Sequence, residues 1–256
     1  MVPLALILTT ISSDAATAIM LRDNTYNVVI VATILLALLV GYAVFAKPRK
    51  DRVKKTIFVS IIIVTVLSTF YLAGTTIYIN TISPTGGPVH WHTDYEIWHC
   101  GNKLDLIDPT GIDNRVGTWE VHEHNDDRMH VEGTVLDLEQ GSFRHFFEII
   151  GATFSDTGFT YPTINGNVTL PYSGTCNGKQ AELQAFLLRV TNPQDAKQWI
   201  YAQQKIPISL DTRMQPYSNV PPGDCLVIEY DVAKETTSHS CASYRAAMNR
   251  GELNGR

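Results

Sequence analysis

Two short stretches of this 256-residue chain concentrate side chains that bind metal ions. The first is PVHWHTDYEIWHC at 88–100, and the second is VHEHNDDRMHVEG at 121–133. Of the eight histidines in the chain, six lie in or between these stretches: His90, His92, His99, His122, His124 and His130. Imidazole nitrogen suits zinc and copper, and a carboxylate ligand is compatible with either metal or with iron. The two stretches therefore predict a metal site, against the alternative that these are ordinary strand and surface histidines.

Pairs of candidate ligands are spaced two residues apart, which places both members on the same face of a β-strand. A His-x-His pair on a strand can therefore direct two imidazoles at one ion. We expect the ligands to come from a set of six side chains: His90, His92, His122, His124, His130 and Glu132. The expected ion is copper or zinc, and the sequence does not distinguish the two. His99, His145 and His239 are expected to lie outside the site.

The register of the second stretch decides whether its histidines meet. The stretch is typical of a hairpin with Asn125, Asp126 and Asp127 as its turn residues. A three-residue loop places His122 opposite His130 and brings the candidate ligands onto one surface. A four-residue loop places His130 opposite Glu123 and separates the histidines onto two faces. The metal prediction therefore requires an odd-numbered loop.

Strands are the elements expected to position these ligands. In VHWHTDYEIW, mostly apolar residues alternate with histidines and carboxylates. This alternation predicts a half-buried strand whose apolar face begins with Val89 and Trp91. MHVEGTVLDL, from Met129, alternates in the same way. Further along the chain we expect a short helix in 142–154, a strand at 181–192, a helix at 192–205 starting near Pro193, and a strand within 221–231. These elements predict a mainly β, α+β domain at 80–235, followed by a polar tail at 236–256.

The N-terminal third of the chain has the pattern of a membrane anchor. Residues 27–46 and 56–79 are apolar and uncharged, and each is long enough to cross a bilayer as a helix. The loop 47–55, KPRKDRVKK, is basic, which favours a cytoplasmic position for it and an extracytoplasmic position for everything after residue 80. Residues 1–18 have the length and the small-residue ending of a signal peptide, and either cleavage or retention in the membrane fits this pattern.

The cysteines and the charge agree with an extracytoplasmic domain. Cys100, Cys176, Cys225 and Cys241 all follow the predicted helices, and they suggest two disulfides with three possible pairings. The net charge of −5, with the basic loop set apart, makes nucleic acid an improbable partner. Uncharged helices argue against proton relay through this chain alone.

The segments HWHTDYEIWHCG, HEHNDDRMHVEG and FFEIIG resemble an uncharacterised family of archaeal membrane-anchored proteins. The resemblance covers roughly residues 80–160 and implies an anchored external domain without implying an activity. The layout of helical hairpin and external β domain is similar to that of cytochrome oxidase subunit II. That family binds dinuclear copper through C-x-x-x-C, a motif that this chain lacks. GTWEVHEHNDDRMHVEG resembles the first cupin motif, but its spacings depart from it.

Three functions remain open at the level of sequence. The first is a membrane-anchored extracytoplasmic protein that binds copper or zinc for metal handling or for support of a membrane redox complex. The second is a metal-dependent enzyme, an oxidoreductase or a hydrolase, with a three-histidine site. The third is a non-catalytic structural subunit of a membrane complex. The bilayer and other subunits of such a complex are the expected partners.

Overall fold

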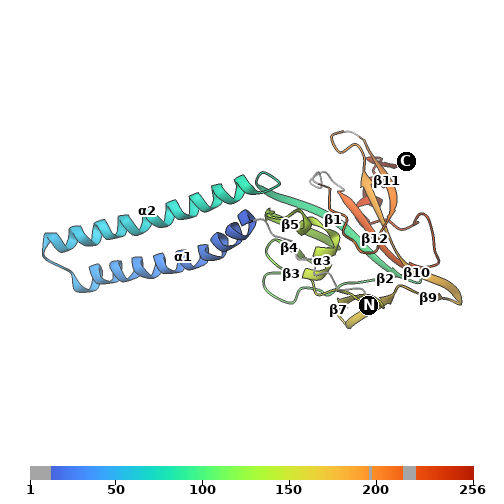
Figure 1. Cartoon of the computed structure of the whole chain (residues 1–256), viewed down its shortest axis with the longest axis horizontal. Coiled ribbons are helices and arrows are strands. Elements are labelled where there is room, and N and C mark those ends of the chain that lie inside the picture. Colours follow the sequence, from blue (N-terminus) through green and yellow to red (C-terminus); the bar gives the residue numbers. More distant parts are fainter. Residues whose placement is uncertain (1–12, 196–197, 216–222) are drawn as a thin grey trace. The chain divides into compact units, whose positions relative to one another are not determined.

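The computed structural model describes residues 13–195, 198–215 and 223–256, and the chain divides into two compact units, Met1–Gly87 and Pro88–Arg256. In the first unit, α1 (Ser13–Ala46) and α2 (Asp51–Ile82) form a helical hairpin (Figure 1). Both helices are long and apolar enough to cross a membrane. Large apolar side chains such as Leu38 and Phe70 are exposed on the hairpin, as lipid-facing residues are.

The structure refines the predicted limits of this hairpin. Because α2 begins at Asp51, the second half of the basic segment 47–55 is helical. Residues 16–18, which resemble a signal-peptide cleavage site, belong to α1, and residues 1–12 of the expected signal lie outside the described residues.

The second unit is rich in β-structure, as the sequence predicts. Its first strands are β1 (Pro88–His99), β2 (Asn102–Leu104), β3 (Val116–Gly117), β4 (Val121–Glu123) and β5 (Arg128–Thr134). A 3₁₀ helix (Leu138–Gly141) and α3 (Phe143–Ile149) follow, and then come β6 (Thr153–Phe154), β7 (Gly158–Thr163), β8 (Gly166–Pro171) and β9 (Ser173–Cys176). The chain continues through β10 (Lys179–Val190), β11 (Trp199–Ile206), β12 (Asp224–Asp231), α4 (Ala242–Asn249) and β13 (Leu253–Gly255).

Most of these strands form one mixed sheet. Within the described residues its order is β13-β11-β10-β12-β1-β5-β4-β3, with β2 paired to β1 and β9 paired to β10. β1 runs parallel to β12 and antiparallel to β5. A second, smaller sheet has the order β6-β7-β8. β1 is therefore an interior strand that connects the two halves of the large sheet.

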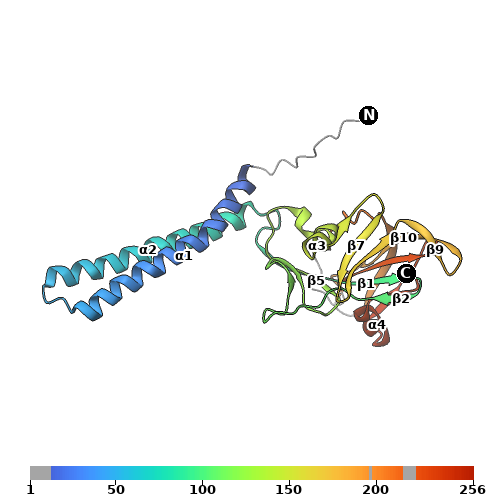
Figure 2. The same ribbon diagram turned by 90° about the horizontal axis from the view of Figure 1, so that it is seen from below.

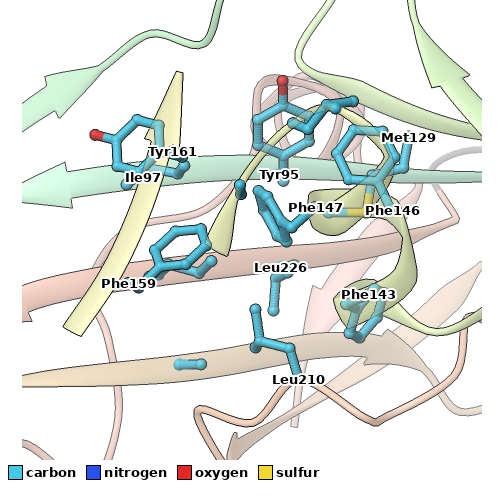
Figure 3. Packing of buried hydrophobic residues seen from close by; sticks show 14 of the residues in the cluster. Tyr95, Ile97, Met129, Phe143, Phe146, Phe147, Phe159, Tyr161, Leu210 and Leu226 are labelled. Carbon is cyan, nitrogen blue, oxygen red and sulfur yellow. The ribbon is translucent and has the colours of Figure 1, made fainter. Parts of the chain in front are cut away.

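The main hydrophobic core covers one face of the large sheet. Tyr95 of β1 packs edge-on against Phe147 of α3, with the ring centroids 5.9 Å apart, and Phe147 packs in turn against Phe159 of β7. These side chains, with Met129 and Leu226, are buried together in Figure 3. The side chains of β1 at positions 91, 95 and 97 thus face this core, as the alternation predicts, and the intervening side chains face the other side of the sheet.

In Figure 2, α4 lies on the other side of the large sheet from α3 and β7. There it covers a second apolar cluster. Tyr244 of α4 is fully buried there, and its hydroxyl, with one proton to donate, lies 2.8 Å from the carbonyl oxygens of both Leu188 and Gly223. The disulfide between Cys225 and Cys241 joins the start of α4 to β12. The segment predicted as a polar tail, 236–256, is therefore part of the folded unit.

The second disulfide joins Cys100 to Cys176, so the structure selects one of the three possible pairings. Both bridges lie in the unit predicted to be extracytoplasmic. Cys100 follows β1 directly, and Cys176 ends β9.

The helix predicted at 192–205 is wrong, because its second half is the strand β11. Residues 192–195 form a turn in which the Asp195 amide donates to the Asn192 carbonyl. The Asn192 side-chain oxygen then accepts a hydrogen bond from the Ile200 amide at 2.6 Å, and this bond connects the turn to the start of β11. Pro193 starts this turn, and pairing with β10 and β13 outweighs the helical propensity of the segment. The helix in 142–154 and the strands at 181–192 and 221–231 are confirmed as α3, β10 and β12.

We expect Tyr244→Ala to destabilise the second unit by about 3 to 5 kcal/mol, because it removes a buried ring and the hydroxyl that donates to the Leu188 and Gly223 carbonyls. Thermal unfolding of the full chain in detergent, followed by near-ultraviolet circular dichroism, measures this change. Arg250→Ala, in the same segment but exposed, serves as the control and is expected to leave the melting temperature unchanged. A melting temperature unchanged by Tyr244→Ala would contradict the packing of α4 on the sheet.

Candidate metal site

Five of the six candidate ligands lie on three adjacent strands, with β5 between β1 and β4, and His124 follows the end of β4 directly. His130 of β5 is paired with His92 of β1 on one side and with His122 of β4 on the other. Directly opposed residues on neighbouring strands form a row across the sheet, and one such row therefore contains three histidines. In the neighbouring row, His90 is paired with Glu132. This is the register that the three-residue loop predicts, and the register of a four-residue loop is not observed.

The turn between β4 and β5 fixes this register. Asn125 and Asp127 adopt left-handed backbone angles, with φ of 67° and 55°, which asparagine and aspartate tolerate better than most residues. The Glu123 carboxylate accepts a hydrogen bond from the Asp126 amide at 2.8 Å. The Tyr95 amide of β1 donates a hydrogen bond to the Asp127 carbonyl at 2.9 Å. The turn is thus tied both to its own hairpin and to β1.

A close approach of β3 holds β4 from its other side. Gly117 has a φ of 115°, and a Cβ at this position would lie 2.5 Å from the Val121 carbonyl oxygen and 3.1 Å from the His122 Cα. Glycine is therefore required where β3 passes His122.

The six predicted ligands come together as two groups that share His130. One group contains His90, His92, His130 and Glu132, and the other contains His122, His124 and His130. Within each group, every residue offers a ligand atom within 4.8 Å of those of the others. Four ligands at zinc–nitrogen distances of about 2.0–2.1 Å are separated by roughly 3.3 Å, so small side-chain rotations would bring the atoms to an ion.

The other three histidines lie elsewhere. His239 stacks on Trp98 with a centroid distance of 3.7 Å, His99 is exposed at the end of β1, and His145 lies on α3. The expectation that these residues lie outside the site agrees with their positions.

Hydrogen bonds orient several of the imidazoles. His124 Nδ1 lies 2.5 Å from the Asn114 carbonyl oxygen, and because a carbonyl only accepts, Nδ1 carries the proton and Nε2 is left with a lone pair. His130 Nε2 lies 3.4 Å from an Asp126 carboxylate oxygen, and His90 Nε2 lies 3.0 Å from Glu132 Oε1. The Asn114 carbonyl orients His124 as the outer-shell partners of metal-binding histidines do. The sequence gives no signal for the Asn114 carbonyl, since it reaches His124 through loop geometry alone.

Burial differs across the cluster. His122 and His130 are 2% and 8% exposed, whereas the side chains of His90 and Glu132 are 59% and 39% exposed. Within the described parts of the chain, Nδ1 of His122 and Nδ1 of His130 are buried and have no hydrogen-bond partner. Burying an unpaired ring nitrogen costs free energy, and a bound metal ion would satisfy it.

Burial and neighbouring rings keep two of the imidazoles neutral. The pKa of His92 is lowered to about 4 by burial and by the nearby His130, His90 and Arg128. The pKa of His122 is also lowered to about 4, by burial and by His124 and His130. Neutral imidazole is the form that binds a metal, so the fold presents these rings in the competent state at neutral pH.

The pKa of Glu123 is shifted in the opposite direction. Burial raises its pKa to about 7, although the amides of Asp126 and Asn125 lower it in part. For Asp126, burial alone would raise the pKa, but the hydrogen bond with His130 and nearby positive charges lower it below its usual value. A carboxyl that is about half protonated near pH 7 thus lies beside one that stays ionised.

The lowered histidine pKa values predict acid sensitivity in the metal-free protein. Between pH 6.5 and 4 the unfolded chain protonates His92 and His122 while the folded chain keeps them neutral, so their contribution is present above pH 6.5 and is lost toward pH 4. Glu123 has the opposite slope, because its raised pKa favours the folded state at acid pH. The test is therefore a comparison with His92→Asn/His122→Asn, in which Glu123 is retained.

In the presence of a chelator, acidification from pH 7 to pH 5 is expected to lower the melting temperature of the wild-type chain by about 4 °C more than that of the double variant. Differential scanning calorimetry in detergent provides the measurement. Parallel pH profiles for the two proteins would contradict the neutral, buried state of these rings.

Comparison with known proteins does not assign the site. No protein-family model matches the chain, and no curated protein and no solved structure matches it. The resemblance to archaeal membrane-anchored proteins therefore stays a prediction, and the function has to be inferred from the geometry and chemistry of the cluster.

Proposed function

We propose that this chain is a membrane-anchored, extracytoplasmic protein that binds copper or zinc through His90, His92, His122, His124, His130 and Glu132. Its role would be to capture or hold the metal at the membrane surface, for metal handling or in support of a neighbouring membrane redox complex. The β-rich unit supplies the ligands, and the helical hairpin supplies the anchor.

The convergence of five imidazoles and a carboxylate from three adjacent strands and the turn after β4 carries this proposal. Rigid, paired strands preorganise the ligands, which lowers the entropic cost of binding. Nitrogen-rich sites with one carboxylate suit copper and zinc better than magnesium or calcium, which prefer oxygen ligands. The unpaired ring nitrogens of His122 and His130 further support an ion in this place.

The distribution of charge and cysteine supports the proposed topology. The basic segment 47–55 between the helices favours the cytoplasm, so both outer ends of the hairpin lie on the other side. Two disulfides in the second unit suit an oxidising compartment. Only residues 83–87 separate α2 from β1, so a short linker tethers the site to the membrane.

A metal-dependent enzyme is the second candidate, and the exposure of His90 and Glu132 favours it. A catalytic metal keeps one coordination position open to water or substrate, and solvent reaches this side of the cluster. A purely structural subunit is the third possibility, and it predicts that the histidines bind no ion.

His92→Ala and His130→Ala are each expected to weaken metal binding at least about tenfold, because each substitution removes a ligand from the centre of the row. The measurement is elemental analysis of the purified full-length protein, followed by zinc competition with a chelator. His99→Ala, on the same strand but exposed and outside the cluster, is the control and should bind like the wild type. Equal metal content in all four proteins would favour the structural subunit.

The topology is tested by cysteine labelling, because the described cysteines are all in disulfides. Lys50→Cys, in the basic segment, is expected to react with a membrane-impermeant maleimide only after cells are permeabilised. Asn165→Cys, exposed in the turn between β7 and β8, should react without permeabilisation. The reverse pattern would place the β-rich unit in the cytoplasm and refute the proposed localisation.

A further inference from the structure

The cluster contains more ligand-type side chains than one ion uses. Zinc sites take three or four protein ligands, whereas six side chains gather here in two groups. We infer that the cluster binds two metal ions at the same time, one on each side of His130, whose imidazole bridges them. This inference rests on the proposed function and specifies the site more closely.

The geometry of the sheet separates the two ions. Neighbouring strands lie about 4.8 Å apart, so β1 and β4, on either side of β5, are roughly 10 Å apart. His92 and His122 therefore flank His130 from opposite sides within the same row. The ring centroid of His130 is 4.6 Å from that of His92 and 5.3 Å from that of His122. Because the ligand atoms lie within 4.8 Å of one another inside each group, metal–nitrogen bonds of about 2 Å favour one ion at each group over a single ion that spans both.

The two positions differ in their ligands and in their exposure. The outer position is formed by His90, His92 and Glu132 with His130, and its side chains at positions 90 and 132 reach solvent. The inner position is formed by His122 and His124 with His130, and it is deeper, since His122 is only 2% exposed. An ion would therefore exchange with solvent more readily at the outer position than at the inner one.

His130 has the chemistry for a bridge. Its Nδ1 is buried and has no hydrogen-bond partner among the described residues, which leaves this atom available to one ion. Its Nε2 contacts Asp126 at 3.4 Å, longer than the usual range of about 2.7–3.2 Å, so this contact is easily given up. When the second metal–nitrogen bond forms, the remaining ring proton leaves to solvent, and the bridge becomes an imidazolate with one negative charge.

The charges around the site compensate two dications. Glu132 and Asp126 contribute two carboxylates, and the bridging imidazolate adds a third negative charge. The nearby guanidinium groups are already paired, Arg128 with Asp94 at 2.6 Å and Arg115 with Asp113 at 3.4 Å. Repulsion between two closely spaced ions is therefore largely offset by groups that the fold already places there.

Zinc stoichiometry on the metal-free, full-length protein in detergent tests the inference. The wild type and His99→Ala are expected to retain two zinc ions per chain after desalting. His90→Ala, at the outer position, and His124→Ala, at the inner position, should each retain one. Loading the wild type with Cu²⁺ instead should give an electron paramagnetic resonance signal weaker than the copper content, because a bridge couples the two spins. Both single variants should restore the uncoupled signal.

One zinc ion per wild-type chain would overturn the two-ion inference and leave the proposed function intact, whereas no bound zinc would overturn both. Two ions in the wild type and in both single variants would place the second ion outside the cluster and refute the inference. Loss of both ions on either substitution would show that the two positions are not separate, and full-intensity copper resonance would exclude the bridge. Near-ultraviolet circular dichroism confirms that each variant is folded before its metal is counted.

Discussion

The pairing of β5 with β1 on one side and β4 on the other is the constraint on which the site depends. It sets His92, His130 and His122 in one row, with His90 and Glu132 in the next. Because side chains alternate between faces along a strand, a slip of one residue in either pairing would turn a whole set of ligands to the opposite face. The left-handed turn at Asn125 and Asp127 is thus as important for the proposed chemistry as the histidines themselves.

The same alternation explains how one sheet combines a core with a candidate metal site. One face of β1 carries Trp91, Tyr95 and Ile97 into the main core, where α3 and the smaller sheet cover them. The other face begins with the candidate ligands His90 and His92 and leads to the region where α4 packs. The apolar face supplies the stability, and it allows the polar face to hold closely spaced imidazoles that repel one another when protonated.

Sequence reasoning worked where the pattern is local. Alternation predicts β1 and β5 and assigns their faces, and the turn residues 125–127 predict the hairpin, although the loop length stays open until the structure settles it. It failed where contacts between distant segments determine the structure. Residues 199–206 form a strand because β10 and β13 pair with them. Residues 236–256 belong to the folded unit because Tyr244 is buried and a disulfide joins Cys225 to Cys241. The disulfide pairing and the contact of the Asn114 carbonyl with His124 depend on distant segments and have no local signature.

The central claim is that imidazoles from separate strands bind the same metal centre. X-ray absorption spectroscopy of the zinc- or copper-loaded full-length protein tests it most directly. The account predicts a first shell of nitrogen and oxygen at about 2.0–2.1 Å, with the outer-shell scattering of several imidazole rings and no sulfur. A shell of oxygen alone, or one without imidazole scattering, would contradict it.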